Sequence, residues 1–105
     1  MFKVIATHTY LKEIENWPKP DKEAVDKTAK NLAENPFIGE QMGYPFLREK
    51  GVRGNKIYYL IYKDLSFVFL VAATQKKDQK ININHIREHL NEFRRVAEEI
   101  SKKAF

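Results

Sequence analysis

Lysine and arginine side chains can bind phosphate groups, and in this chain they are concentrated in one stretch. Residues 48–80 carry eight cations against three anions, a net charge of +5, whereas the remaining 72 residues carry eleven of each sign. The eight cations are Arg48, Lys50, Arg53, Lys56, Lys63, Lys76, Lys77 and Lys80. Cations that serve only solubility would be spread along the chain, so this concentration indicates a surface that binds a polyanion, and we expect RNA or DNA. The alternative is a solvated basic rim with no role in chemistry.

Two side chains in or near this stretch could transfer a proton. Glu49 could transfer a proton through its carboxylate. His85 could give or take a proton because histidine titrates near neutral pH. The alternative for Glu49 is a surface carboxylate that balances Arg48 and Lys50, and for His85 it is a solvated helix position. His85 and His89 could both face a divalent metal, but no third ligand of the H-E-x-x-H kind lies near them. We therefore expect neither a metal site nor a cofactor.

Aromatic residues follow the cations along the same stretch. Tyrosine and phenylalanine rings can stack on unpaired bases, as they do in sheet-based RNA-binding proteins. Such a cluster is more often part of a hydrophobic core, and we expect three of the five rings to be buried. The five are Tyr58, Tyr59, Tyr62, Phe67 and Phe69.

Length and composition indicate one globular domain that spans residues 1–105. The chain is 43% hydrophobic and 31% charged, and a domain of this size buries roughly two thirds of the surface that its unfolded chain exposes. It has no cysteine, which excludes disulfide bonds and thiolate sites and is typical of a reducing compartment. We find no signal peptide and no run of about 18 apolar residues that could span a membrane. We expect a soluble, cytoplasmic protein that does not bind membranes.

The N-terminal elements that must position these side chains are a strand and two helices. Residues 2–7 form a β-prone run, and Thr9 is a suitable N-cap for a short helix after it. Asp21 would cap a second helix, which ends before Pro36. Residues 36–45 contain two glycines and two prolines, which predicts a loop.

Three strands and one helix follow. Residues 46–52 resemble a strand, and residues 56–62 and 66–74 predict an antiparallel hairpin with two apolar faces. So small a chain has helices for only one face, so we expect something else to cover the other. Residues 83–102 have apolar side chains at 3-4-3-4-3 spacing, which predicts one continuous amphipathic helix. The expected fold class is α+β, with an N-terminal strand, two helices, a three-stranded antiparallel meander and a C-terminal helix.

This order of elements, with basic residues at the rims of the strands, resembles the RelE/ParE superfamily of bacterial and archaeal toxins over nearly the whole chain. The anchors are Asn35-Pro36 at the end of the second helix, the predicted hairpin, and the basic segment 75–80. At the third strand the family has an aromatic residue and an arginine, then an apolar pair and an aromatic residue. This chain has Asn-Lys-Ile-Tyr-Tyr at 55–59. After the fourth strand the family has glycine and basic residues, and this chain has Thr-Gln-Lys-Lys at 74–77.

The resemblance implies an endoribonuclease that cuts messenger RNA on the ribosome, by in-line attack of a 2′-hydroxyl on the adjacent phosphate. Lys56 and Lys76 match the family's two arginines and would stabilise the charge that develops on the phosphate, supported by Lys77 and Arg48. Lysine lacks the planar fork with which arginine binds phosphate through two hydrogen bonds.

The resemblance leaves the proton-transfer residues open. Some family members use a tyrosine near the C-terminus, and the matching position here is Asn82. Glu49 and His85 therefore remain the candidates for this step. The expected nucleic-acid contacts are Arg48, Lys50, Arg53, Lys77 and Lys80.

Three functions follow from the resemblance. The first is the toxin of a type II toxin–antitoxin pair, whose partners are messenger RNA on the ribosome and a cognate antitoxin that wraps the basic and apolar surface. The second is a ParE-like toxin that inhibits DNA gyrase and cuts no RNA. Lysine in place of arginine and asparagine in place of tyrosine favour this second function. The third is a degenerate, non-toxic module that only binds nucleic acid.

Overall fold

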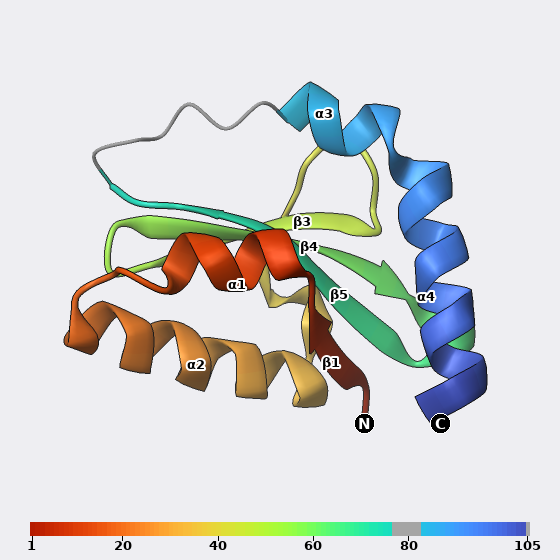
Figure 1. Cartoon of the computed structure of the whole chain (residues 1–105), viewed down its shortest axis with the longest axis horizontal. Helices are drawn as coiled ribbons and strands as arrows, with labels where there is room; N and C mark the ends of the chain where they lie inside the picture. Colours follow the sequence, from red (N-terminus) through yellow and green to blue (C-terminus); the bar gives the residue numbers. More distant parts are fainter. Residues whose placement is uncertain (77–82, 105) are drawn as a thin grey trace.

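A five-stranded sheet forms the centre of the structure, a computed structural model that describes residues 1–76 and 83–104 (Figure 1). The strands are β1 (Lys3–Ala6), β2 (Glu40–Gln41), β3 (Leu47–Val52), β4 (Asn55–Tyr62) and β5 (Phe67–Thr74). The helices are α1 (His8–Ile14), α2 (Lys19–Glu34), α3 (Ile83–Glu88) and α4 (Leu90–Ala104), with short 3-10 helices η1 (Pro36–Ile38) and η2 (Lys63–Leu65). The strand order is β1-β5-β4-β3-β2, with β1 parallel to β5 and the other neighbours antiparallel. The predicted α+β class and the antiparallel meander β3-β4-β5 are confirmed.

Both N-terminal helices begin earlier than the sequence predicted. α1 is capped by Thr7, whose Oγ1 accepts a hydrogen bond from the Tyr10 N–H at 3.1 Å, so Thr9 lies inside the helix. α2 begins two residues before Asp21, which lies in the first turn rather than at the cap. A proline in that turn is tolerated because N–H groups there have no helical partner. The helix ends before Asn35, where it was predicted to end.

Helices cover both faces of the sheet, which corrects the expectation that one face would lack a helix (Figure 1). Side chains of α1 and α2 pack on one face, which includes Ile57, Tyr59, Ile61, Val68 and Leu70. Side chains of α3 and α4 pack on the other face, which includes Tyr58, Leu60, Tyr62, Phe67 and Phe69. The second face is covered because α4 supplies its own apolar stripe, formed by Phe93, Ala97 and Ile100.

The five aromatic side chains considered for base stacking are all buried, although the sequence suggested only three. The most accessible, Tyr62, is 8% exposed. Tyr59 faces α2, and its hydroxyl donates a hydrogen bond to the Pro36 carbonyl at 2.7 Å and accepts one from the Gly39 N–H at 3.1 Å. The other four rings lie in the core beneath α3 and α4. These rings therefore build the core and offer no open stacking surface.

The C-terminal helix is not continuous, contrary to the prediction from its apolar spacing. It breaks at His89, whose N–H bonds to the Ile86 carbonyl at 3.1 Å, while its Nδ1 lies 2.7 Å from the His85 carbonyl. The imidazole thus occupies the His85 carbonyl, to which the His89 N–H would bond in a continuous helix, and α3 ends there. α4 then turns away along the sheet, as Figure 1 shows.

A tight turn between β3 and β4 fixes the register of the candidate site. Arg53 and Gly54 both have positive φ, 53° and 85°, which is the backbone of a two-residue hairpin turn with the twist that strands favour. Glu49 therefore pairs with Tyr58, and Gly51 pairs with Lys56. Because side chains alternate along a strand, Glu49, Tyr58 and Lys56 point to the same face of the sheet.

Candidate functional site

Lys56 and Glu49 form an ion pair on the face of the sheet that carries α3 and α4. The Lys56 Nζ lies 3.2 Å from the Glu49 Oε1, and their side chains are 37% and 14% exposed. The pair is diagonal across β3 and β4, because Glu49 pairs directly with Tyr58 and Lys56 is two residues before it. A cation that can reach a phosphate and a carboxylate that can accept a proton are thus brought together.

Tyr58 is the direct cross-strand neighbour of Glu49, and the two side chains lie on the same face of the sheet. Tyr58 is only 3% exposed, and burial, together with the charge of Glu49 and a hydrogen bond to it, raises the pKa of Tyr58 to about 12. The phenol is therefore neutral at physiological pH and can donate to Glu49. Glu49 thus contacts a cation and has a neutral donor as its cross-strand neighbour.

Lys76 lies at the same end of the sheet as Lys56. Lys56 pairs with Thr74, the last residue of β5, and Lys76 lies two residues beyond it. Its backbone N–H donates a hydrogen bond to the Asn55 Oδ1 at 2.9 Å, and its side chain packs over Gly54, where an added Cβ would lie 3.0 Å from the Lys76 Cδ. The two lysines predicted to bind phosphate therefore belong to one end of one hairpin. Lys77, Lys80 and Asn82 lie outside the described residues.

The other predicted nucleic-acid contacts are placed differently. Arg48 pairs with Tyr59 on the face of α1 and α2, and its guanidinium donates to the carbonyls of Pro45 at 2.7 Å and Gly39 at 3.0 Å. Lys50 points to that same face, because it is two residues further along β3. Arg53 lies in the turn. Its Nε contacts the Asp21 Oδ1 at 2.6 Å, which lowers the pKa of Asp21. Arg48 and Arg53 thus hold loops and helix starts in place.

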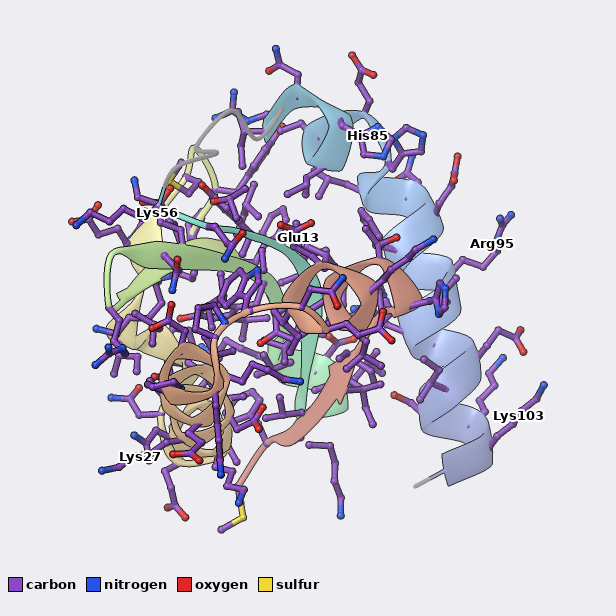
Figure 2. All side chains as sticks on the ribbon, turned by 60° about the vertical axis from the view of Figure 1, so that its left-hand side comes forward. Glu13, Lys27, Lys56, His85, Arg95 and Lys103 are labelled. Atoms are coloured by element: carbon purple, nitrogen blue, oxygen red, sulfur yellow. The ribbon has the colours of Figure 1, made fainter. Side chains whose placement is uncertain are left out.

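His85 is not brought to the Lys56–Glu49 pair. It lies on α3, and Figure 2 shows it well apart from Lys56. Its ring stacks against His89 with centroids 4.3 Å apart, and it lines a cleft of about 260 Å³ together with Glu13 of α1. The structure therefore does not bring His85 together with Lys56 and Glu49.

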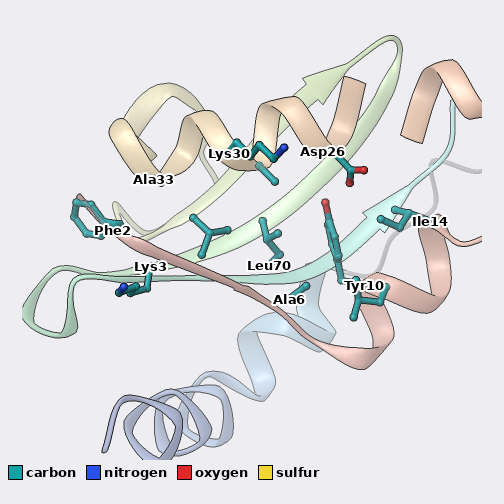
Figure 3. A pocket seen from close by; sticks show the side chains of 12 residues that line it. Phe2, Lys3, Ala6, Tyr10, Ile14, Asp26, Lys30, Ala33 and Leu70 are labelled. Carbon is teal, nitrogen blue, oxygen red and sulfur yellow. The ribbon is translucent and has the colours of Figure 1, made fainter. Parts of the chain in front are cut away.

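A second cavity, which the sequence did not indicate, lies between α1, α2 and β1 (Figure 3). Its volume is about 500 Å³, and its walls are mostly apolar. The buried Tyr10 hydroxyl points toward Asp26 (Figure 3), and burial followed by the charge of Asp26 raises the pKa of Tyr10. The small side chains Ala29 and Ala33 on the inner side of α2 leave this space open. The helical spacing of these two alanines was the one sign of the cavity in the sequence. It was not used because alanines in a helical stripe usually indicate close packing.

Two structural absences concern the described part of the chain. In residues 1–76 and 83–104 no three His, Asp or Glu side chains lie close enough together to hold a metal ion. Within those same residues, no helix combines the length and apolar character needed to cross a membrane.

Comparison with known proteins identifies the fold. Neither a protein-family model nor a curated protein sequence matches the chain. The isolated RelE toxin of E. coli superimposes on it with a TM-score of 0.67, over 84% of this chain and 98% of RelE, at 16% sequence identity. The chain has the RelE fold.

Two further structures with this RelE fold contain an antitoxin. A chain of the intact E. coli RelBE toxin–antitoxin complex matches with a TM-score of 0.65 and 19% identity, over 71% of this chain and 96% of that one. A variant of E. coli RelE bound to a peptide of the antitoxin RelB matches with a TM-score of 0.64 and 16% identity, over 85% and 93%. At these identities the likeness is one of fold, so the chemistry of the site must be argued from its own side chains.

Proposed function

We propose that this chain is the toxin of a type II toxin–antitoxin pair and cuts messenger RNA on the ribosome. The observation that carries the proposal is the contact of Lys56 with Glu49 on a RelE fold, which holds a cation and a carboxylate 3.2 Å apart. A surface that only binds phosphate gains nothing from a carboxylate beside its cation, because the two anions repel each other. A cleavage site needs both groups, one for charge and one for a proton.

In the proposed reaction Glu49 accepts the proton of a ribose 2′-hydroxyl, and the 2′-oxygen attacks the adjacent phosphorus. The bond from phosphorus to the 5′-oxygen of the next nucleotide breaks, which leaves a 2′,3′-cyclic phosphate and a 5′-hydroxyl. The 5′-oxygen takes its proton from water. Lys56, with Lys76 at the same end of the sheet, stabilises the extra negative charge on the phosphate oxygens.

The proposal includes the ribosome because two of the described cations predicted to contact RNA are engaged within the protein. Arg48 donates to backbone carbonyls, and Arg53 is paired with Asp21. In-line attack requires the 2′-oxygen, the phosphorus and the leaving oxygen to be held nearly collinear. A ribosome that fixes the messenger RNA would supply this alignment, and the toxin would supply Lys56 and Glu49.

The proposed partner in the resting cell is a cognate antitoxin. Its support is the match to RelE chains whose structures contain RelB, and the apolar cavity between α1 and α2. Leu11 at the edge of that cavity is 52% exposed, so an apolar surface is open to a protein segment.

The test is to induce the protein in a bacterial host and map new RNA 5′ ends, beside a Lys56→Ala, Lys76→Ala double variant. The expected result is new ends confined to translated regions, absent in the double variant. Arrested growth with unchanged RNA would contradict the nuclease and support the gyrase inhibitor. Normal growth with unchanged RNA would support the non-toxic binding module.

A further inference from the structure

Glu49 is held from two sides, and the two contacts differ in how firmly they are fixed. Lys56 is long, flexible and 37% exposed, so its ammonium can move toward a phosphate. The Tyr58 ring is 3% exposed and lies in the core beneath α3 and α4. Its hydroxyl therefore keeps one position, and Tyr58 is paired directly with Glu49 across β3 and β4, so the two side chains are neighbours on one face of the sheet. The charge of Glu49 is one of the causes that raise the pKa of Tyr58.

This difference matters when RNA binds. A phosphate attracts the Lys56 ammonium, so the Lys56–Glu49 contact weakens at the moment when Glu49 must face the 2′-hydroxyl. A carboxylate on a flexible glutamate side chain would then have several rotamers open to it. A donor on a buried ring keeps it in one of them at little further entropic cost, because folding has already fixed the ring.

We propose that Tyr58 is the positioning residue of the site and that its hydroxyl holds the Glu49 carboxylate in place when Lys56 turns to the phosphate. The part of this inference that concerns cleavage rests on the proposed function. The contact between Tyr58 and Glu49 has a readout of its own that needs no cleavage.

Tyr62 provides a matched control on the same strand and the same face. It is also buried, at 8% exposure, and burial raises its pKa to about 12 as well. Among the described residues its hydroxyl has no hydrogen-bond partner. Tyr62→Phe therefore removes a buried hydroxyl that holds nothing, whereas Tyr58→Phe removes the one that holds Glu49.

The first experiment measures single-turnover cleavage of messenger RNA on purified ribosomes across pH. Tyr58→Phe should slow cleavage about tenfold, the usual size for a lost hydrogen bond to a charged group, whereas Tyr62→Phe should stay within about twofold. Equal rates for the two phenylalanine variants would overturn the proposal.

The second experiment follows the ring ¹³Cζ signals of the tyrosines by NMR as pH rises. In the wild type Tyr58 should titrate at about 12, and Glu49→Gln should lower that midpoint while leaving Tyr62 unchanged. An unmoved Tyr58 midpoint would overturn the contact whatever the cleavage data show. If the midpoint moves but the wild type cuts no RNA, the proposed function is at fault and the positioning role is lost with it, although the contact itself is real.

Discussion

Lys56 can interact with two anions, the Glu49 carboxylate that it already contacts and any phosphate that approaches its exposed side. An ion pair this accessible to water contributes at most about 1 kcal/mol to folding. The pair is therefore weak enough to rearrange when a phosphate binds. Its value lies in position rather than in stability, so its removal should affect activity far more than folding.

Substitution of Lys56 tests this difference between activity and stability. Lys56→Gln should lower single-turnover cleavage on ribosomes by about 100-fold, because the charge on the phosphate in the transition state is no longer stabilised. Lys56→Arg should keep most of the activity, since a guanidinium also binds phosphate. Both variants should unfold in urea within about 1 kcal/mol of the wild type.

The matched control is Lys27→Gln, which removes an equal charge from an exposed lysine on α2 (Figure 2). It should leave the cleavage rate unchanged. If Lys27→Gln slowed cleavage as much as Lys56→Gln, overall charge rather than position would control the rate. Lys56 would then have no specific place in the site.

At the scale of single residues the sequence indicated Lys56 and Glu49, the first through the family resemblance, but not their contact or the role of Tyr58. The contact depends on register, and Glu49 and Tyr58 meet because they are equally distant from the Arg53–Gly54 turn. This equal distance can be counted in the sequence, but only once the two turn residues are known. His85 could not be placed, because the direction of a helix relative to a sheet is not encoded in its own spacing.

Among the elements, the strands lie close to where the sequence predicted them, whereas the bounds of the helices differ more from the prediction. Alternating β-branched and aromatic residues with tight turns define β4 and β5 locally. The break at His89 lies within a stripe whose 3-4 spacing runs through it without interruption. The contact of the His89 side chain with the His85 carbonyl lies at that break, and the apolar spacing carries no information about it.

The β3–β4 turn is the element on which the site depends most, and Gly54→Ala tests it. Gly54 has φ 85°, and an added Cβ would lie 3.0 Å from the Lys76 Cδ. The substitution should lower the free energy of unfolding by about 1–2 kcal/mol, the cost of a left-handed backbone for a residue with a side chain. Cleavage should also fall, because Lys76 must move.

Gly51→Ala is the matched control for this turn. Its nearest atom to an added Cβ lies 4.0 Å away and its φ is not positive, so alanine should be neutral or slightly stabilising in the strand. Urea unfolding of both variants measures the difference. If the two glycine variants lost equal stability, the positive φ of Gly54 would not be the feature that holds the hairpin.

At the scale of the whole molecule, the described cations of the 48–80 stretch do not all lie on one face of the sheet. Arg48 and Lys50 point toward α1 and α2, Arg53 binds Asp21, and Lys56 contacts Glu49. The sequence concentrates these cations in one stretch, but the alternation of strand side chains divides the described ones between two faces. Both faces are apolar in the middle of the sheet, so folding buries tyrosine rings on each of them.

These buried tyrosines should make the whole fold sensitive to alkaline pH. Burial raises the pKa of Tyr58 and Tyr62 to about 12, and it also raises the pKa of Tyr10 and Tyr59. An unfolded chain releases its tyrosine protons near pH 10. Because the folded chain holds them more tightly, their contribution to stability is complete below about pH 10 and is lost as pH rises toward 12.

Urea unfolding at pH 9.5 and pH 11 measures this loss. The wild type should lose about 2 kcal/mol or more between them, and Tyr62→Phe should lose about 1 kcal/mol less, because one raised pKa has been removed. Lysines also titrate in this range, but they do so in both proteins, so the difference between the variant and the wild type isolates the tyrosine. An identical loss in the two proteins would mean that the Tyr62 hydroxyl is not held neutral by the core. The alkaline loss of stability would then come from the other buried tyrosines, Tyr10, Tyr58 and Tyr59.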